Sequence, residues 1–139
     1  MKMRDLEIWG VPSYIVDIWE KNYSPYLLPV QEKAVRDYRV LDYEEGKIYP
    51  HPALSPQGRG LDGNQNLLVI APTSSGKTFI GEMAAITQAV HKQKTIYLVP
   101  LRSLAEEKYH HFRELYADCN INTLISSRDR REDDPKEKT

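Results

Sequence analysis

Apolar residues along this chain follow two different spacings. Over residues 12–22 and again after residue 78 they recur three or four positions apart, the spacing of one face of a helix. The unbroken apolar runs at 67–70 and 95–99 are instead typical of buried strands. The pattern therefore predicts a helical N-terminal part, followed by a part in which strands and helices alternate.

The N-terminal part, residues 1–42, is expected to form a short lead-in and two helices. Pro12 suits the first turn of the first helix, which ends near residue 22. Pro29 lies just ahead of the second helix, which is expected to reach about Val40. The apolar stripe predicted to pack the first helix into a core consists of Tyr14, Ile15, Ile18 and Trp19.

Residues 43–62 have no apolar period and are rich in proline and glycine. Leu-Asp pairs precede this stretch at 41–42 and close it at 61–62. We interpret 43–62 as an inserted disordered loop, because closure entropy grows slowly with length and makes surface insertions cheap. Rapid proteolysis within residues 46–60 is the expected consequence.

The remainder, 63–139, reads as a β-α-β-α-β unit. Strands are expected at 67–71, 95–99 and 121–126, with helices from about 79 to 91 and from 102 to 117. Short links between such elements imply a parallel sheet with right-handed crossovers and helices on both faces. The predicted fold class is therefore α/β, with ligand bound at the carboxyl ends of the strands. The charged tail, 128–139, is expected to fray.

Between the first strand and its helix lies APTSSGKT, residues 71–78, which we term the phosphate loop. It follows the pattern G-x-x-x-x-G-K-[ST], with Ala71 at the first position. Its backbone amides can form an anion nest, and Gly76 allows a phosphate to approach closely. Lys77 is expected to reach the β- and γ-phosphates, and Thr78 to coordinate Mg²⁺. The alternative is an ordinary strand–turn–helix with a solvated lysine.

Gln31, near the start of the second helix, has two possible roles. Its side-chain amide could cap the helix, or it could present a paired donor and acceptor to an adenine edge.

Composition sets broad limits on function. The net charge of −1 gives no global basic field for nucleic acid, although a local groove could still bind it. The single cysteine, Cys119, excludes an internal disulfide and fits a reducing, cytoplasmic setting. Neither a signal peptide nor a membrane span is expected. His110 and His111 are adjacent, and on a helix they would point too far apart to share a metal ion.

Four blocks resemble one family, the superfamily 2 DExH/DEAD-box helicases, in its Ski-type and archaeal repair branch. The phosphate loop resembles motif I, and YLVPLRSLAEEKY at 97–109 resembles motif Ia of the DExH branch. LLPVQ at 27–31 is similar to the adenine-reading Q motif, and ISSRDR at 125–130 falls where motif Ib is expected. The resemblance, over about 6–42 and 63–134, implies a partial RecA-like P-loop NTPase lobe preceded by a helical Q-motif segment.

The resemblance implies ATP and Mg²⁺ as cofactors and nucleic acid as partner. Lys77 and Thr78 would carry the chemistry, with Thr78 on the metal. Nucleotide would be held by Gln31, Thr73, Ser74, Ser75, Gly76, Lys77 and Thr78. One nucleic-acid strand would be contacted without sequence preference by Pro100, Leu101, Arg102, Ser126 and Ser127. Arg128 departs from the family, since many relatives carry glycine there.

The family's Asp-Glu-x-His element occurs nowhere in the 139 residues, nor does a second lobe with its arginine finger. That element supplies a Mg²⁺ contact and positions the attacking water. We therefore expect an N-terminal fragment of the first motor lobe, inactive alone, whose partner could be the rest of a split helicase. Since the Asp-Glu strand lies between the first two strands in this family, its absence predicts poor solubility or a partly molten state.

Two other readings remain open. One is a non-catalytic remnant that binds nucleotide or a partner without turnover; a reading frame continuing beyond residue 139 with Asp-Glu-x-His would argue against it. The other is a small-molecule kinase, against which stand motif Ia, Gln31 and the lack of a visible lid segment.

Overall fold

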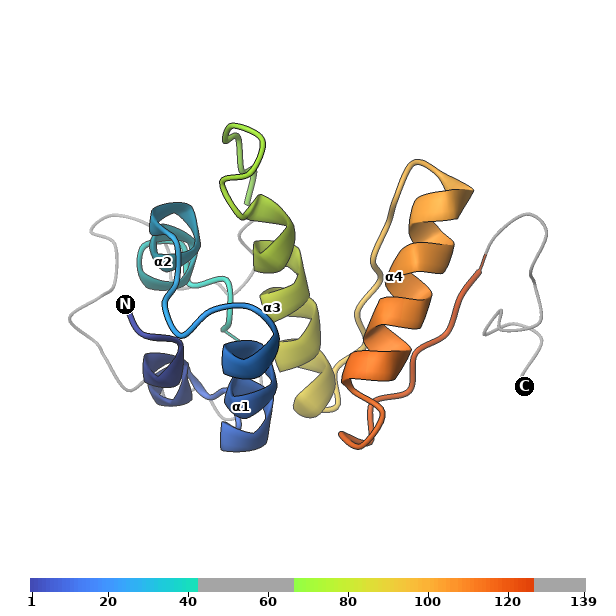
Figure 1. The fold of residues 1–139 in the computed structure, drawn as a ribbon, viewed down its shortest axis with the longest axis horizontal. Coiled ribbons are helices and arrows are strands. Elements are labelled where there is room, and N and C mark those ends of the chain that lie inside the picture. The colour runs from blue at the N-terminus through green and yellow to red at the C-terminus, as the bar shows by residue number, and fades with distance from the viewer. Residues whose placement is uncertain (43–66, 127–139) are drawn as a thin grey trace. The chain divides into compact units, whose positions relative to one another are not determined.

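The computed structural model describes residues 1–42 and 67–126. Two compact units divide the chain, Met1–Thr95 and Ile96–Thr139. The described elements are the 3₁₀ helix η1 (Met3–Trp9) and the helices α1 (Ser13–Asn22), α2 (Pro29–Arg36), α3 (Lys77–Val90) and α4 (Arg102–Leu115) (Figure 1). The first unit contains η1 and α1 to α3, and the second contains α4.

The predicted N-terminal helices are confirmed, with two differences. The lead-in forms η1, which buries Met3 and Leu6. The helix α2 starts with Pro29 at its first position, but it ends at Arg36 instead of reaching Val40. Arg39 has φ of 53°, a left-handed conformation that a continuing helix cannot contain.

In the core of the first unit, α1 packs on η1 and meets α3 through aromatic rings. Trp19 is fully buried, and its ring meets that of Phe79 edge-on, with centroids 5.3 Å apart. The predicted stripe is wrong at Tyr14, which is 48% exposed. The prediction is confirmed at Ile15 and Trp19, but Val16 points inward in place of Tyr14, giving a buried face spaced i, i+1, i+4.

A hydrogen bond joins Tyr23, at the end of α1, to Glu82 of α3. The Tyr23 hydroxyl donates to the carboxylate of Glu82, at 2.8 Å and 2.7 Å from its two oxygens. Glu82 is buried within α3, and the Tyr23 ring lies 4.7 Å from that of Phe79. The buried carboxylate therefore has a donor from a residue outside its own helix.

This contact predicts a loss of stability in alkali. Partial burial and the neighbouring carboxylate both raise the pKa of Tyr23 above its ordinary value of about 10. Above that pH the unfolded chain releases the phenolic proton while the folded chain retains it, so the free energy of unfolding falls as pH rises. Because Tyr23 is 41% exposed, water moderates the effect. Urea unfolding at pH 8 and pH 10.5 should show a steeper decline for the native chain than for Tyr23→Phe; equal slopes would contradict it.

The second unit packs aromatic residues of α4 against the chain before it. Tyr109 and Phe112 of α4 are buried, and so is Tyr116, which follows the helix. The Tyr97 ring meets Phe112 edge-on, with centroids 5.7 Å apart. The helix predicted over 102–117 is confirmed in substance, ending at Leu115.

The described residues contain no β-strand, so the predicted parallel sheet is not confirmed. In each of two predicted strands the exposure alternates. Leu68 and Ile70 are 82% and 86% exposed, and Ile96 and Leu98 are 82% and 87% exposed, whereas the residues between them are half-buried. A β-strand needs backbone hydrogen bonds to a neighbouring strand. Within the described residues these runs pack side chains on one side but are not paired as strands.

Some predictions fall on residues outside the described ranges. These are the inserted loop at 43–62, the tail at 128–139 and the residue Ser127.

Candidate phosphate-binding site

The phosphate loop turns sharply just before α3. Ser74 has φ of 68° and Gly76 has φ of 86°, so two of three consecutive residues are left-handed. The Ser75 amide donates to the Pro72 carbonyl at 3.2 Å, which closes the turn. Glycine adopts this conformation at little cost, and Gly76 is the residue from which α3 starts.

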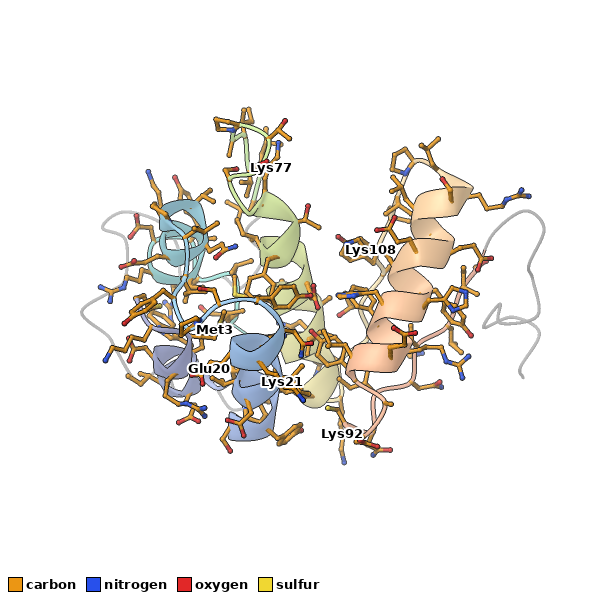
Figure 2. The ribbon with its side chains drawn as sticks, viewed as in Figure 1. Met3, Glu20, Lys21, Lys77, Lys92 and Lys108 are labelled. Atoms are coloured by element: carbon orange, nitrogen blue, oxygen red, sulfur yellow. The ribbon has the colours of Figure 1, made fainter. Side chains whose placement is uncertain are left out.

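Lys77 is the first residue of α3, and its side chain folds back over the loop. The Nζ ammonium donates to the Ala71 carbonyl at 2.7 Å. Figure 2 shows Lys77 at the loop end of α3. Since Gly76 has no side chain to cap the helix, the amides of the first turn are open to an outside acceptor. A cation, helix amides and a tight loop thus converge on one small region.

Small hydroxyl residues complete the loop. Thr73, Ser74 and Thr78 are exposed, so their hydroxyls are accessible to a ligand. The Ser75 Oγ is buried and has no hydrogen-bond partner among the residues that the structure describes. A buried hydroxyl without a partner costs about 1–3 kcal/mol, which a ligand oxygen within reach would offset.

Gln31 lies against the phosphate loop. Its Oε1 accepts from the Leu28 amide at 2.8 Å, which caps α2 from the helix's third position. Its Nε2 donates to the Gly76 carbonyl at 3.0 Å, and the residue is buried. The capping role considered from the sequence is thus present. The bond to Gly76 was missed, because it joins positions 45 residues apart and no local pattern signals it.

The predicted nucleic-acid residues lie in the second unit. Pro100 and Arg102 are exposed, and Leu101 is 59% exposed. Arg102 opens α4, whose N-cap residue Leu101 makes no side-chain capping bond. Ser126 is exposed near the end of the described chain. The start of α4 therefore combines open helix amides with a guanidinium.

Among the described helices, none has the length and apolar character needed to cross a bilayer.

Comparison with known proteins covers both the phosphate loop and α4. The sequence profile described as DEAD/DEAH box helicase matches residues 57–138, more than half of the 139 residues. The ATP-dependent DNA helicase Hel308 of Thermococcus kodakarensis is 39% identical over 88 residues, which are 63% of this chain and 8% of the relative. Hel308 of Methanocella arvoryzae is 33% identical over 114 residues, 82% of this chain and 12% of the relative.

A plant protein is also similar. The chloroplastic DExH-box ATP-dependent RNA helicase DExH15 of Arabidopsis thaliana is 41% identical over 59 residues, 42% of this chain and 5% of that relative. The chain thus spans only a small part of the length of these relatives. No solved structure matches it significantly. The profile match, which includes the phosphate loop and α4, shows that this chain belongs to the DEAD/DEAH box helicase family.

Proposed function

We propose that this chain binds ATP with Mg²⁺ as part of an ATP-dependent nucleic-acid helicase. The observation that carries the proposal is the phosphate loop, where the left-handed Gly76 opens α3 beside an ammonium held over the loop. Such a loop stabilises a polyphosphate through amides and charge together. The family membership supports ATP as the nucleotide.

Each residue of the loop has a proposed role. Thr73 to Gly76 present amides and hydroxyls to the phosphates. Lys77, now bonded to Ala71, neutralises charge on the β- and γ-phosphates. Thr78 supplies a hydroxyl ligand to Mg²⁺, consistent with its exposed position in the first turn of α3.

The second unit is proposed to contact the nucleic-acid backbone. Phosphate is favoured at the N-terminus of α4 by the helix dipole, and Arg102 adds a full charge. Ser126 and Ser127 would contact further phosphates through hydroxyls and amides. The archaeal relatives are named as DNA helicases and the plant relative as an RNA helicase. We therefore propose a backbone-directed contact, which both kinds of nucleic acid offer.

Turnover is proposed to need groups beyond these 139 residues. Their sequence contains no Asp-Glu-x-His element to position the attacking water. The chain by itself is therefore expected to hold ATP while its hydrolysis rate stays at background.

The proposal is tested by the Mg²⁺ dependence of ATP binding in calorimetry. For the native chain, Mg²⁺ should tighten ATP binding. Thr78→Ala should lose most of this gain, because its side chain can no longer bind the metal, and should bind ATP in EDTA as the native chain does. Thr78→Ser, which keeps the hydroxyl, is the matched control and should retain the gain. Absence of ATP binding by the folded native chain would overturn the proposed function.

A further inference from the structure

One buried side chain links the two helix starts in the first unit. Gln31 uses its oxygen on the Leu28 amide at the start of α2 and its nitrogen on the Gly76 carbonyl at the start of α3. The two helices pack against each other (Figure 1). Since the amide is hydrogen-bonded at both ends, protein groups fix its position.

The space around Gly76 shows how closely the two fit. A Cβ placed on Gly76 would lie 2.4 Å from Gln31 Nε2 and 2.7 Å from Leu28 Cδ1. No side chain larger than hydrogen fits there unless these neighbours move. The contact therefore constrains both the dihedral angles and the location of the residue that precedes Lys77.

We infer that Gln31 is a positioning residue of the phosphate loop: by holding the Gly76 carbonyl against α2, it sets the amides and Lys77 in place for a polyphosphate, whatever the base attached to it. This inference rests on the proposed function of the loop. This role differs from the base-reading role that the family resemblance implies. A positioning residue changes the affinity for polyphosphates that have no base, whereas a base-reading residue does not.

Gln31→Glu separates the two bonds of the amide. A carboxylate still accepts from the Leu28 amide, but it has no N–H to donate to the Gly76 carbonyl, and the two oxygens repel each other. Gln31→Met keeps a similar volume and removes both bonds of the amide without adding charge. A matched control is Gln88→Glu, since Gln88 Nε2 donates to the Asp42 carbonyl at 2.6 Å far along α3 from the loop.

The experiment measures the affinities of the full chain and these variants for ATP, GTP and inorganic tripolyphosphate. Both Gln31 variants should bind all three ligands more weakly, by a similar factor of about fivefold or more. Gln88→Glu should leave the three affinities unchanged. A loss confined to ATP, with tripolyphosphate and GTP unaffected, would show that Gln31 reads the base and would overturn the inference.

Amide hydrogen exchange of the chain without ligand provides an independent readout. Exchange at the Ser75 amide, which donates to the Pro72 carbonyl, should accelerate in Gln31→Met, while amides of α1 keep their native rates; an unchanged Ser75 rate would overturn the inference. If the native chain binds none of the three ligands, the proposed function fails, and the exchange result alone decides whether Gln31 positions the loop. If Gln31→Glu does not fold, Gln31→Met supplies both readouts.

Discussion

Alanine in place of Lys77 is expected to weaken ATP binding by about 10- to 100-fold. The Nζ group lies 2.7 Å from the Ala71 carbonyl, so the protein itself holds the ammonium over the phosphate loop. A hydrogen bond to a charged group contributes about 1.5–3 kcal/mol, and each 1.4 kcal/mol is a factor of about ten in affinity. Isothermal calorimetry with ATP and Mg²⁺ measures the difference.

Lys21→Ala is the matched control for this experiment. Lys21 is an exposed lysine in the last turn of α1, and Figure 2 shows it on a different element from Lys77. Its removal changes the net charge by the same amount and should leave the affinity for ATP close to native. Equal weak binding by the native chain and Lys77→Ala would remove the assignment of the phosphate loop.

Trp19→Ala should have the largest effect on stability, about 3–5 kcal/mol for a large aromatic residue removed from a core. The side chain is fully buried and packs edge-on against Phe79, two residues after Lys77. Its loss leaves a cavity between α1 and α3 that these helices cannot close without moving the start of α3. The free energy of unfolding of a native protein is about 5–15 kcal/mol in total. The midpoint of urea unfolding should therefore fall by a large amount.

Tyr14→Ala, in the same helix, is the comparison for Trp19→Ala. Tyr14 is 48% exposed, and surface substitutions usually change stability by less than about 0.5 kcal/mol. Similar midpoints for the two variants would mean that α1 does not pack through Trp19, and the described core would be wrong.

The helices and the phosphate loop were predictable because their signals are local. Apolar spacing located α1, α3 and α4, and the Gly-Lys-Thr sequence marked the start of α3. The face of α1 was less predictable. Tyr14 and Val16 can both pack in a core, and the inward face of α1 depends on its neighbours: η1, and Phe79, which lies 60 positions beyond Trp19 in the sequence.

The strands and the Gln31 contact depend on partners distant in the sequence. An apolar run such as 95–99 has strand character, but a strand forms only beside another strand. Gln31 likewise had two plausible local roles, and its bond to the Gly76 carbonyl depends on how α2 packs against α3. The local pattern therefore predicts the chemistry of the loop, whereas the contact that supports the loop is visible only in the structure.

Leu68 and Ile70 in the first unit, and Ile96 and Leu98 in the second, present hydrocarbon to water at every other position. Exposed apolar segments of this kind bind chaperones and other copies of the same chain. In a newly made molecule, binding of another polypeptide to these segments then competes with self-association. Because self-association depends steeply on concentration, the yield of usable protein should be set more by expression level than by the intrinsic stability of its helices.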